Sequence, residues 1–332
     1  MKKIFLLTKF RHFNQLKSKK CMLVRMKRKK KKRIRKYIST KNKQYILKNT
    51  IKAPENLSMI ENMENYMDFL DEIDYYGFKR QDLELDFSEV KNITPDGLLM
   101  IIAYLNRYKN RNPQCNINGN SPDNNDCFRI FEESCFYQYA FSNHRPKKDD
   151  ILLSIRSDMM ICPDDAGAVA KFVRNKLGIN DLIFTKAIYT VIMESMTNVR
   201  DHAYKKKKGR GEGYWWLMAM PAKNKNTIRF ALVDNGKGIP KTMRKKLISD
   251  DVLKKDGELI QATVLENKRS STKLHYRGRG LPKMKELVTS SKIKNLNIIS
   301  RKGGYFIDED KTYDLNDKEY FGTVICWEFF KE

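Results

Sequence analysis

The stretch FALVDNGKGIP, residues 230–240, constrains the fold of this chain more than any other segment. Its apolar start predicts a buried strand that ends at Asp234. Gly236 and Gly238 then predict a turn where a ligand passes close to the backbone, because glycine has no side chain. A carboxylate beside such a turn can accept a hydrogen bond from an exocyclic amine. Asp-x-Gly turns are common, so the rest of the chain has to support this interpretation.

The positive charge of the chain is concentrated near its start. The 332 residues carry a formal net charge of +26, yet residues 1–50 contain 20 Lys or Arg and no Asp or Glu. This basic arm is densest from Lys27 to Lys36. Such an arm suits contact with nucleic-acid phosphates or anionic lipid heads, or it serves as a solvated tail. We expect residues 1–50 to form a flexible arm, with nucleic acid as a candidate partner.

The composition predicts a packed protein without a membrane span. Hydrophobic residues make up 41% of the chain, and no apolar stretch approaches the length of a transmembrane segment. The first apolar run, Ile4 to Leu7, is too short for a signal peptide. The six cysteines include no C-x-x-C pair, so reduced thiols are expected. These features favour a cytoplasmic protein.

Residues 51–155 predict a small α/β domain. An amphipathic helix pattern in residues 55–73 precedes an alternating strand pattern in residues 82–90. The apolar run in residues 98–105 predicts a buried helix, and residues 121–141 predict an aromatic-rich helix after a candidate short strand. Alternation of this kind is typical of a layered α/β domain.

The segment LELDFSEVKNITPDGLLMI resembles the STAS domain, the fold of bacterial anti-anti-sigma factors. That family has a phosphorylatable serine in an Asp-Ser-Ser-Gly turn, where this chain has Thr94, Pro95, Asp96 and Gly97. The serine is absent, so a switch that depends on phosphorylation at this turn is disfavoured. The resemblance therefore implies an interaction or scaffolding role for the domain.

Residues 156–332 predict an α+β fold of the two-layer α/β sandwich type. Residues 162–178 have Pro-Asp-Asp directly after Cys162 and end with Gly, which indicates a helix, and residues 181–204 indicate a longer one. Alternating segments before and after AKNKN, residues 222–226, predict a hairpin. A helix near Pro282 and closing strands complete the domain.

Two polar residues share one face of the longer predicted helix. Glu194 and Asn198 are four residues apart in an otherwise apolar segment. The carboxylate can act as a general base or orient a water molecule. The amide oxygen can bind Mg²⁺, which takes its other ligands from water and substrate phosphates. Taken alone, the pair is more typical of an ordinary helix surface.

Two later segments add a glycine turn and a threonine. YRGRGLPKM places Gly278 and Gly280 directly before a helix, where backbone N–H groups can bind phosphate. YFGTVICWEF places Thr323 at the head of the last strand, where its hydroxyl can bridge a base or a water. No Walker A loop or Rossmann fingerprint occurs in the chain. Each segment is a weak signal by itself.

In this order, Glu-x-x-x-Asn, Asp-x-Gly-x-Gly, Gly-x-Gly and Gly-Thr resemble the GHKL (Bergerat) nucleotide-binding fold. Gyrase subunits, heat-shock chaperones, histidine kinases and MutL-type repair proteins share that fold. The resemblance implies that ATP and Mg²⁺ are the ligands and that residues 240–277 form a mobile lid. The implied roles are catalytic base for Glu194, Mg²⁺ ligand for Asn198, adenine contact for Asp234, adenine-side turn for Gly236 and Gly238, phosphate contact for Gly278 and Gly280, and a position near the base for Thr323.

Three functional hypotheses stay open at this point. The first is an ATP-driven regulatory switch or ATPase that acts on a protein partner. The second is a protein serine/threonine kinase resembling the anti-sigma-factor kinases. The third is an ATP-regulated nucleic-acid-binding adaptor. An orthodox histidine kinase is disfavoured, because neither His12 nor His144 lies in a predicted acceptor helix. The oligomeric state is open, with a dimer as one candidate.

Overall fold

The computed structural model describes residues 50–141, 156–158, 160–204, 214–222, 226–246, 254–265, 280–290 and 293–331. The basic arm from Lys27 to Lys36, Gly278 and His144 lie outside these ranges. The segment Thr50–Glu332 forms one compact unit that combines helices with parallel and antiparallel sheets. The predicted α+β class is therefore confirmed. The predicted boundary between residues 155 and 156 stays a prediction.

The first part of this unit, residues 50–141, is built on short parallel strands. The three-stranded sheet has the order β1 (Thr50–Lys52), β3 (Leu83–Asp86), β5 (Ile117–Gly119), and β2 (Asn56–Leu57) pairs with β4 (Asn92–Ile93). The helices are α2 (Met63–Lys79), α3 (Pro95–Arg111), α4 (Asn125–Glu133) and α5 (Phe136–Ala140). The sequence predicts one aromatic helix over residues 121–141, but Cys135 takes a left-handed φ of 59° and separates α4 from α5.

The turn before α3 is closed against β2. Thr94 is buried and its hydroxyl donates to the carbonyl of Leu57 at 3.0 Å. The Asp96 carboxylate accepts the N–H of Met59 at 2.7 Å, and burial raises its pKa. A Cβ on Gly97 would overlap the Leu57 carbonyl, so only glycine fits there. Residues 94–97 therefore present no exposed hydroxyl.

The second part contains a seven-stranded antiparallel sheet with the order β11-β10-β9-β12-β8-β7-β6. The expected hairpin is formed by β7 and β8. The strands are β6 (Arg156–Asp158), β7 (Trp215–Pro221), β8 (Thr227–Asp234), β9 (Lys294–Arg301), β10 (Gly303–Phe306), β11 (Lys311–Asp314) and β12 (Tyr320–Phe330). The central strand β12 pairs with β8 on one side and β9 on the other.

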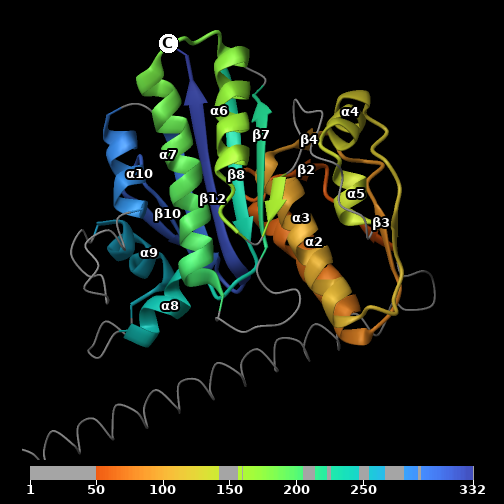
Figure 1. Ribbon diagram of the computed structural model, residues 1–332. Coiled ribbons are helices and arrows are strands. Elements are labelled where there is room, and N and C mark those ends of the chain that lie inside the picture. The colour runs from red at the N-terminus through yellow and green to blue at the C-terminus, as the bar shows by residue number, and fades with distance from the viewer. Residues whose placement is uncertain are drawn as a thin grey trace, which may run out of the picture. The chain divides into compact units, whose positions relative to one another are not determined.

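Helices cover both faces of this sheet. On one face lie α6 (Pro163–Leu177), α7 (Leu182–Asn198) and α10 (Gly280–Thr289), which share a core with Leu232 and Trp327 (Figure 1). On the other face α3 packs against β7 and β8. The expected two-layer sandwich thus gains a third layer. The reason is that β7 is apolar on both faces, so Trp216 and Met218 need a second cover.

Two predicted elements, the longer helix and the lid, differ from the structure. The helix expected over residues 181–204 is α-helical only to Asn198 and continues as the π-helical turn η1 (Val199–Ala203). The expected lid, residues 240–277, contains α8 (Ile239–Lys246) and α9 (Asp256–Leu265). A mobile cover is wrong for α9, because Ile260 and Val264 are buried in the core and Gly257 packs closely on Gly304.

None of the described helices has both the length and the apolarity needed to cross a bilayer. The five cysteines within the described residues are all free thiols.

Candidate functional site

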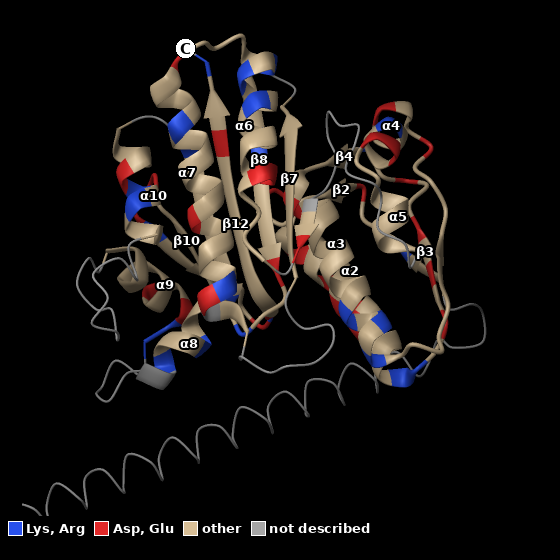
Figure 2. Ribbon diagram, in the orientation of Figure 1, with Lys and Arg blue, Asp and Glu red and all other residues tan. Residues whose placement is uncertain are grey.

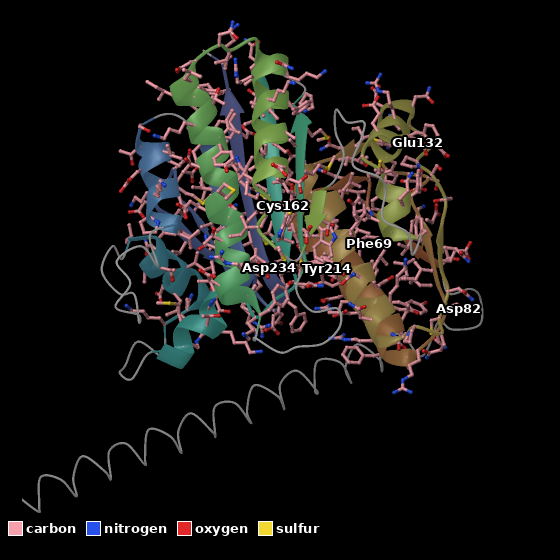
Figure 3. The ribbon with its side chains drawn as sticks, in the orientation of Figure 1. Phe69, Asp82, Glu132, Cys162, Tyr214 and Asp234 are labelled. Atoms are coloured by element: carbon pink, nitrogen blue, oxygen red, sulfur yellow. The ribbon has the colours of Figure 1, made fainter. Side chains whose placement is uncertain are left out.

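Asp234 is a buried carboxylate at the end of β8. Only 3% of the residue is exposed, because the apolar strand carries it into the sheet. Its Oδ1 accepts the N–H of Gly236 at 2.7 Å, and the hydroxyl of Thr323, its partner on β12, donates to the carboxylate. Burial raises the pKa of Asp234 to about 7, although these hydrogen bonds favour the charged form. Figure 3 labels Asp234 at this end of the sheet, near Tyr214. The structure therefore brings Asp234 and Thr323 together as predicted.

The glycine turn after Asp234 packs against the end of α7. A Cβ on Gly236 would lie 2.6 Å from both Cβ and O of Ala203, in η1. The N–H of Lys237 donates to the same Ala203 carbonyl at 2.8 Å. The sequence predicts room for a ligand at Gly236, but the missing side chain makes room for η1 instead. A π-helical turn of this kind is frequent at functional sites, and here it ties Asn198 to the turn that follows Asp234.

Ser300 is a buried residue of the site that no sequence motif marks. Its hydroxyl donates to the carbonyl of Gly322 at 2.6 Å and accepts the N–H of Ile239 at 3.0 Å. One side chain thus connects β9, the glycine turn and β12. Gly238 has a φ of 77°, and a Cβ there would lie 2.7 Å from the Ser300 hydroxyl. Gly238 is therefore needed both for its backbone conformation and for this contact.

Glu194 and Asn198 meet the first residue of α10. Glu194 and Lys186 are the only charged residues of α7, which is otherwise uncharged in Figure 2. A Cβ on Gly280 would lie 3.0 Å from Oε2 of Glu194 and 3.3 Å from Oδ1 of Asn198. Because Gly280 has no side chain, the space next to the Glu194 carboxylate and the Asn198 amide stays open. The structure brings together these three predicted residues, although Gly280 is far from the other two in the sequence.

The amide of Asn198 has unused bonding capacity. Its Nδ2 is buried and has no hydrogen-bond partner among the described residues. A buried polar group without a partner costs about 1–3 kcal/mol, so such a group usually serves a ligand or a water molecule. Beside it, Oε1 of Glu194 lies 3.2 Å from Nζ of Lys283 on α10. This part of the site thus offers an amide, a carboxylate and a half-exposed cation.

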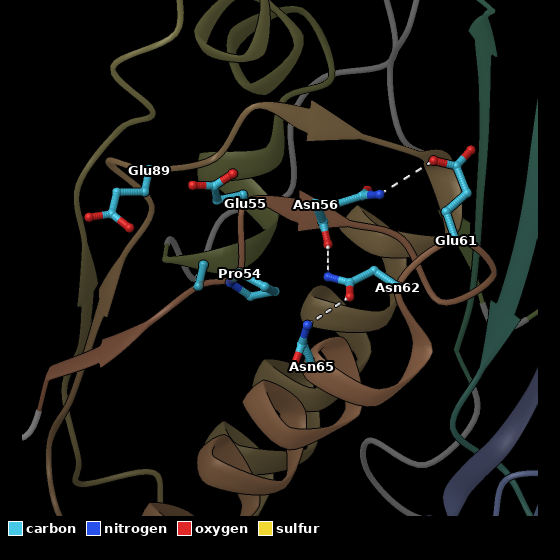
Figure 4. A pocket seen from close by; sticks show the side chains of 8 residues that line it. Pro54, Glu55, Asn56, Glu61, Asn62, Asn65 and Glu89 are labelled. Carbon is cyan, nitrogen blue, oxygen red and sulfur yellow. Dashed lines mark hydrogen bonds between the residues drawn. The ribbon is translucent and has the colours of Figure 1, made fainter.

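An open hollow elsewhere lacks these features. It measures about 500 Å³ and is lined mainly by Glu55, Glu61, Glu89 and neighbouring asparagines (Figure 4). Each of its three carboxylates already pairs with a cation of the chain: Lys91 with Glu55, Arg229 with Glu61 and Lys52 with Glu89. The asparagines bond to one another and to the backbone. We assign no ligand to this hollow.

Seven of the eight predicted site residues lie in the described part of the chain. They form two groups, one around Asp234 and one around Glu194, and η1 links the two. Sequence reasoning missed Ser300 and Ala203, because neither belongs to one of the four motifs and each acts through a tertiary contact. Within the described residues, no three His, Cys, Asp or Glu side chains gather as metal ligands. Comparison of the chain with protein-family models and with curated proteins finds no match.

Proposed function

We propose that this chain is a Mg²⁺-dependent ATP-binding protein of the GHKL class and that it hydrolyses ATP to drive a regulatory switch. The observation that carries the proposal is the approach of Gly280 to Glu194 and Asn198. Separate sequence motifs supply these residues in the order typical of that class, and Nδ2 of Asn198, close to Gly280, has no hydrogen-bond partner among the described residues. The buried Asp234–Thr323 pair supplies a second polar position for the adenine base.

On the adenine side, the ionised Asp234 carboxylate accepts a hydrogen bond from the exocyclic amine. The strand and the glycine turn hold this carboxylate in a fixed direction, since the Gly236 N–H already occupies one of its lone pairs. The Thr323 hydroxyl contacts the same carboxylate and can bridge it to the base or to a water. Discrimination for adenine follows, because a base with a carbonyl oxygen at that position would face a carboxylate oxygen.

On the phosphate side, the amide oxygen of Asn198 would hold Mg²⁺ together with water and phosphate oxygens. When bound, Mg²⁺ neutralises phosphate charge. Gly280 opens α10, so the N–H groups of its first turn have no helical partners and can bind phosphate. Glu194 is the base that orients or deprotonates the attacking water. Its ion pair with Lys283 holds the carboxylate until Lys283 turns to the phosphates.

Turnover of γ-labelled ATP by the purified full-length chain with Mg²⁺ tests the proposal. We expect labelled phosphate to be released. Glu194→Gln is expected to keep ATP binding and to lose hydrolysis by about 10²–10⁴-fold, the usual contribution of a general base. Glu286→Gln, a carboxylate elsewhere on α10, is the matched control and retains the wild-type rate. Wild-type turnover in Glu194→Gln would exclude the catalytic role.

The same experiment separates the alternatives. Label on a protein instead of free phosphate would favour a serine/threonine kinase, whose target must then lie outside the closed turn at Thr94. ATP binding that depends on residues 1–45 and nucleic acid would favour the adaptor hypothesis. If ATP affinity survives Asp234→Ala, the site assignment itself is wrong.

A further inference from the structure

Tyr320, the first residue of β12, holds the backbone of Asp234. Tyr320 is buried, and its hydroxyl donates to the Asp234 main-chain oxygen at 2.7 Å. The regular pairing of β12 with β8 begins only at Thr323, opposite Asp234. Between Tyr320 and Thr323 the pairing with β9 shifts register. The Tyr320 hydroxyl thus adds one hydrogen bond to the main chain of Asp234, at the point where the regular pairing of β12 with β8 stops.

Helix α3 of the first part of the unit fixes Tyr320 in turn. The rings of Tyr104 and Tyr320 are stacked, with centroids 6.0 Å apart and an interplanar angle of 28°. The guanidinium of Arg107, one turn along α3, lies over the Tyr104 ring at 4.5 Å and over the Phe321 ring at 4.6 Å. Arg107 also forms an ion pair with Asp74 of α2. Two helices therefore brace the aromatic pair that contacts Asp234.

The residue after Asp234 is held from the same helix. The side-chain amide of Asn235 donates to the carbonyl of Ala103 at 3.4 Å, and its Oδ1 accepts the hydroxyl of Tyr204 at 2.9 Å. Asp234 is thus constrained by α3 through its own carbonyl and through its neighbour. A displacement of α3 relative to β8 would move both constraints together.

We infer that Tyr320 is a positioning residue for Asp234, and that Tyr104 of α3 makes the first part of the unit a component of the adenine site. The inference rests on the proposed function. It implies that a partner that shifts α3 changes the affinity and the base preference for nucleotide, and that nucleotide changes the affinity for that partner by the same factor.

Equilibrium binding of ATP and of inosine triphosphate to the full-length chain with Mg²⁺ tests the inference. Inosine triphosphate has a carbonyl oxygen where ATP has the amine, so its phosphate contacts are unchanged. Tyr320→Phe keeps the ring and removes only the hydroxyl. We expect ATP affinity to fall about tenfold, because a displaced Asp234 carboxylate weakens its contact with the adenine amine by about 1.4 kcal/mol. Affinity for inosine triphosphate changes much less, so the preference for ATP shrinks.

Tyr104→Phe is the matched control, because it keeps the ring that stacks on Tyr320 and removes only a hydroxyl that does not contact Asp234. Both affinities stay at their wild-type values in this variant. Tyr104→Leu removes the stacked ring and has the same expected effect as Tyr320→Phe, which covers the case that Tyr320→Phe does not fold. Phe131→Leu destabilises the aromatic core of α4 and α5 and is expected to keep the preference for ATP.

The outcomes separate the two proposals. A wild-type chain that binds no nucleotide, or binds both equally, contradicts the proposed function. A wild-type preference for ATP that Tyr320→Phe and Tyr104→Leu both retain overturns the positioning role and leaves the proposed function intact. If Phe131→Leu also loses the preference for ATP, the effect of Tyr320→Phe comes from a general loss of stability and the positioning role is overturned.

Discussion

Replacing the buried carboxylate Asp234 with asparagine gives the sharpest test of the site's electrostatics. Burial raises the pKa of Asp234 from its ordinary value of 3.8 to about 7. The folded protein therefore keeps a proton on this group that the unfolded chain has already lost between those two pH values. The free energy of unfolding falls as pH rises through this window, and the contribution is constant above pH 7. Each pKa unit is worth about 1.4 kcal/mol, so the total loss is about 4 kcal/mol.

Asp234→Asn cannot ionise, so it should not show this loss. The free energy of unfolding of wild type relative to Asp234→Asn is expected to decrease by about 4 kcal/mol between pH 4 and pH 8. Wild type and variant are compared at the same pH, so the contributions of all other titrating groups to the free energy of unfolding cancel. The amide of the variant adds a donor to a buried position, which lowers its stability equally at all pH values. The pH dependence of the difference is therefore the quantity to measure.

Urea unfolding followed by tryptophan fluorescence measures this difference. Trp215 is the register partner of Asp234 on β7, and Trp327 lies in the same sheet, so unfolding of this region changes their environment. Asp126→Asn, an exposed carboxylate on α4, controls for the loss of one carboxylate at the surface. Parallel stability curves for wild type and Asp234→Asn across pH 4–8 would refute the buried-carboxylate argument.

Three further substitutions probe the glycines and the ion pair. Gly280→Ala places a methyl 3.0 Å from Glu194, so we expect calorimetry to show about tenfold weaker ATP binding without loss of stability. Gly167→Ala, whose new methyl meets no atom within 4 Å, is its control. Gly322→Ala overlaps the backbone of β8 at a φ of 140°, and denaturant unfolding should show a loss of about 3 kcal/mol or more. Lys283→Met removes an exposed ion pair, so unfolding free energy changes by less than about 1 kcal/mol while ATP affinity falls.

The elements with a strong local pattern were predictable from the sequence. α6 begins at Pro163 and ends before Gly178, whose φ of 61° suits a left-handed C-cap. The proline and the glycine in the sequence predict these two ends correctly. The alternation in β8 and the turn after it were equally local. Strands β1, β6 and β11 were missed, because three or four residues carry no periodicity and their pairing depends on neighbouring strands.

The candidate site was predictable only in part. The resemblance to the GHKL fold implied that Glu194, Asn198 and Gly280 share one site, although Gly280 opens a different helix much later in the chain. The role of Gly236 was not predictable, because a glycine that admits a ligand and a glycine that admits another segment of chain have the same sequence signature. Ser300 was missed for a similar reason, since a serine in a strand becomes a clamp only when β12 and the turn meet it.

By itself, the sequence determined the α+β class, the order of the helices and main strands, and the residues that gather at the ends of α7 and β8. The class and the order of elements follow from local periodicity and turn chemistry, which act over a few residues, whereas the gathering of the site residues was implied by the resemblance to the GHKL fold. Only the tertiary structure decided that α3 covers the second face of the sheet and reaches Asp234 through Tyr104 and Tyr320. The physical reason is that burial, the raised pKa of Asp234 and long-range contacts depend on which surfaces meet, and no local pattern encodes that choice.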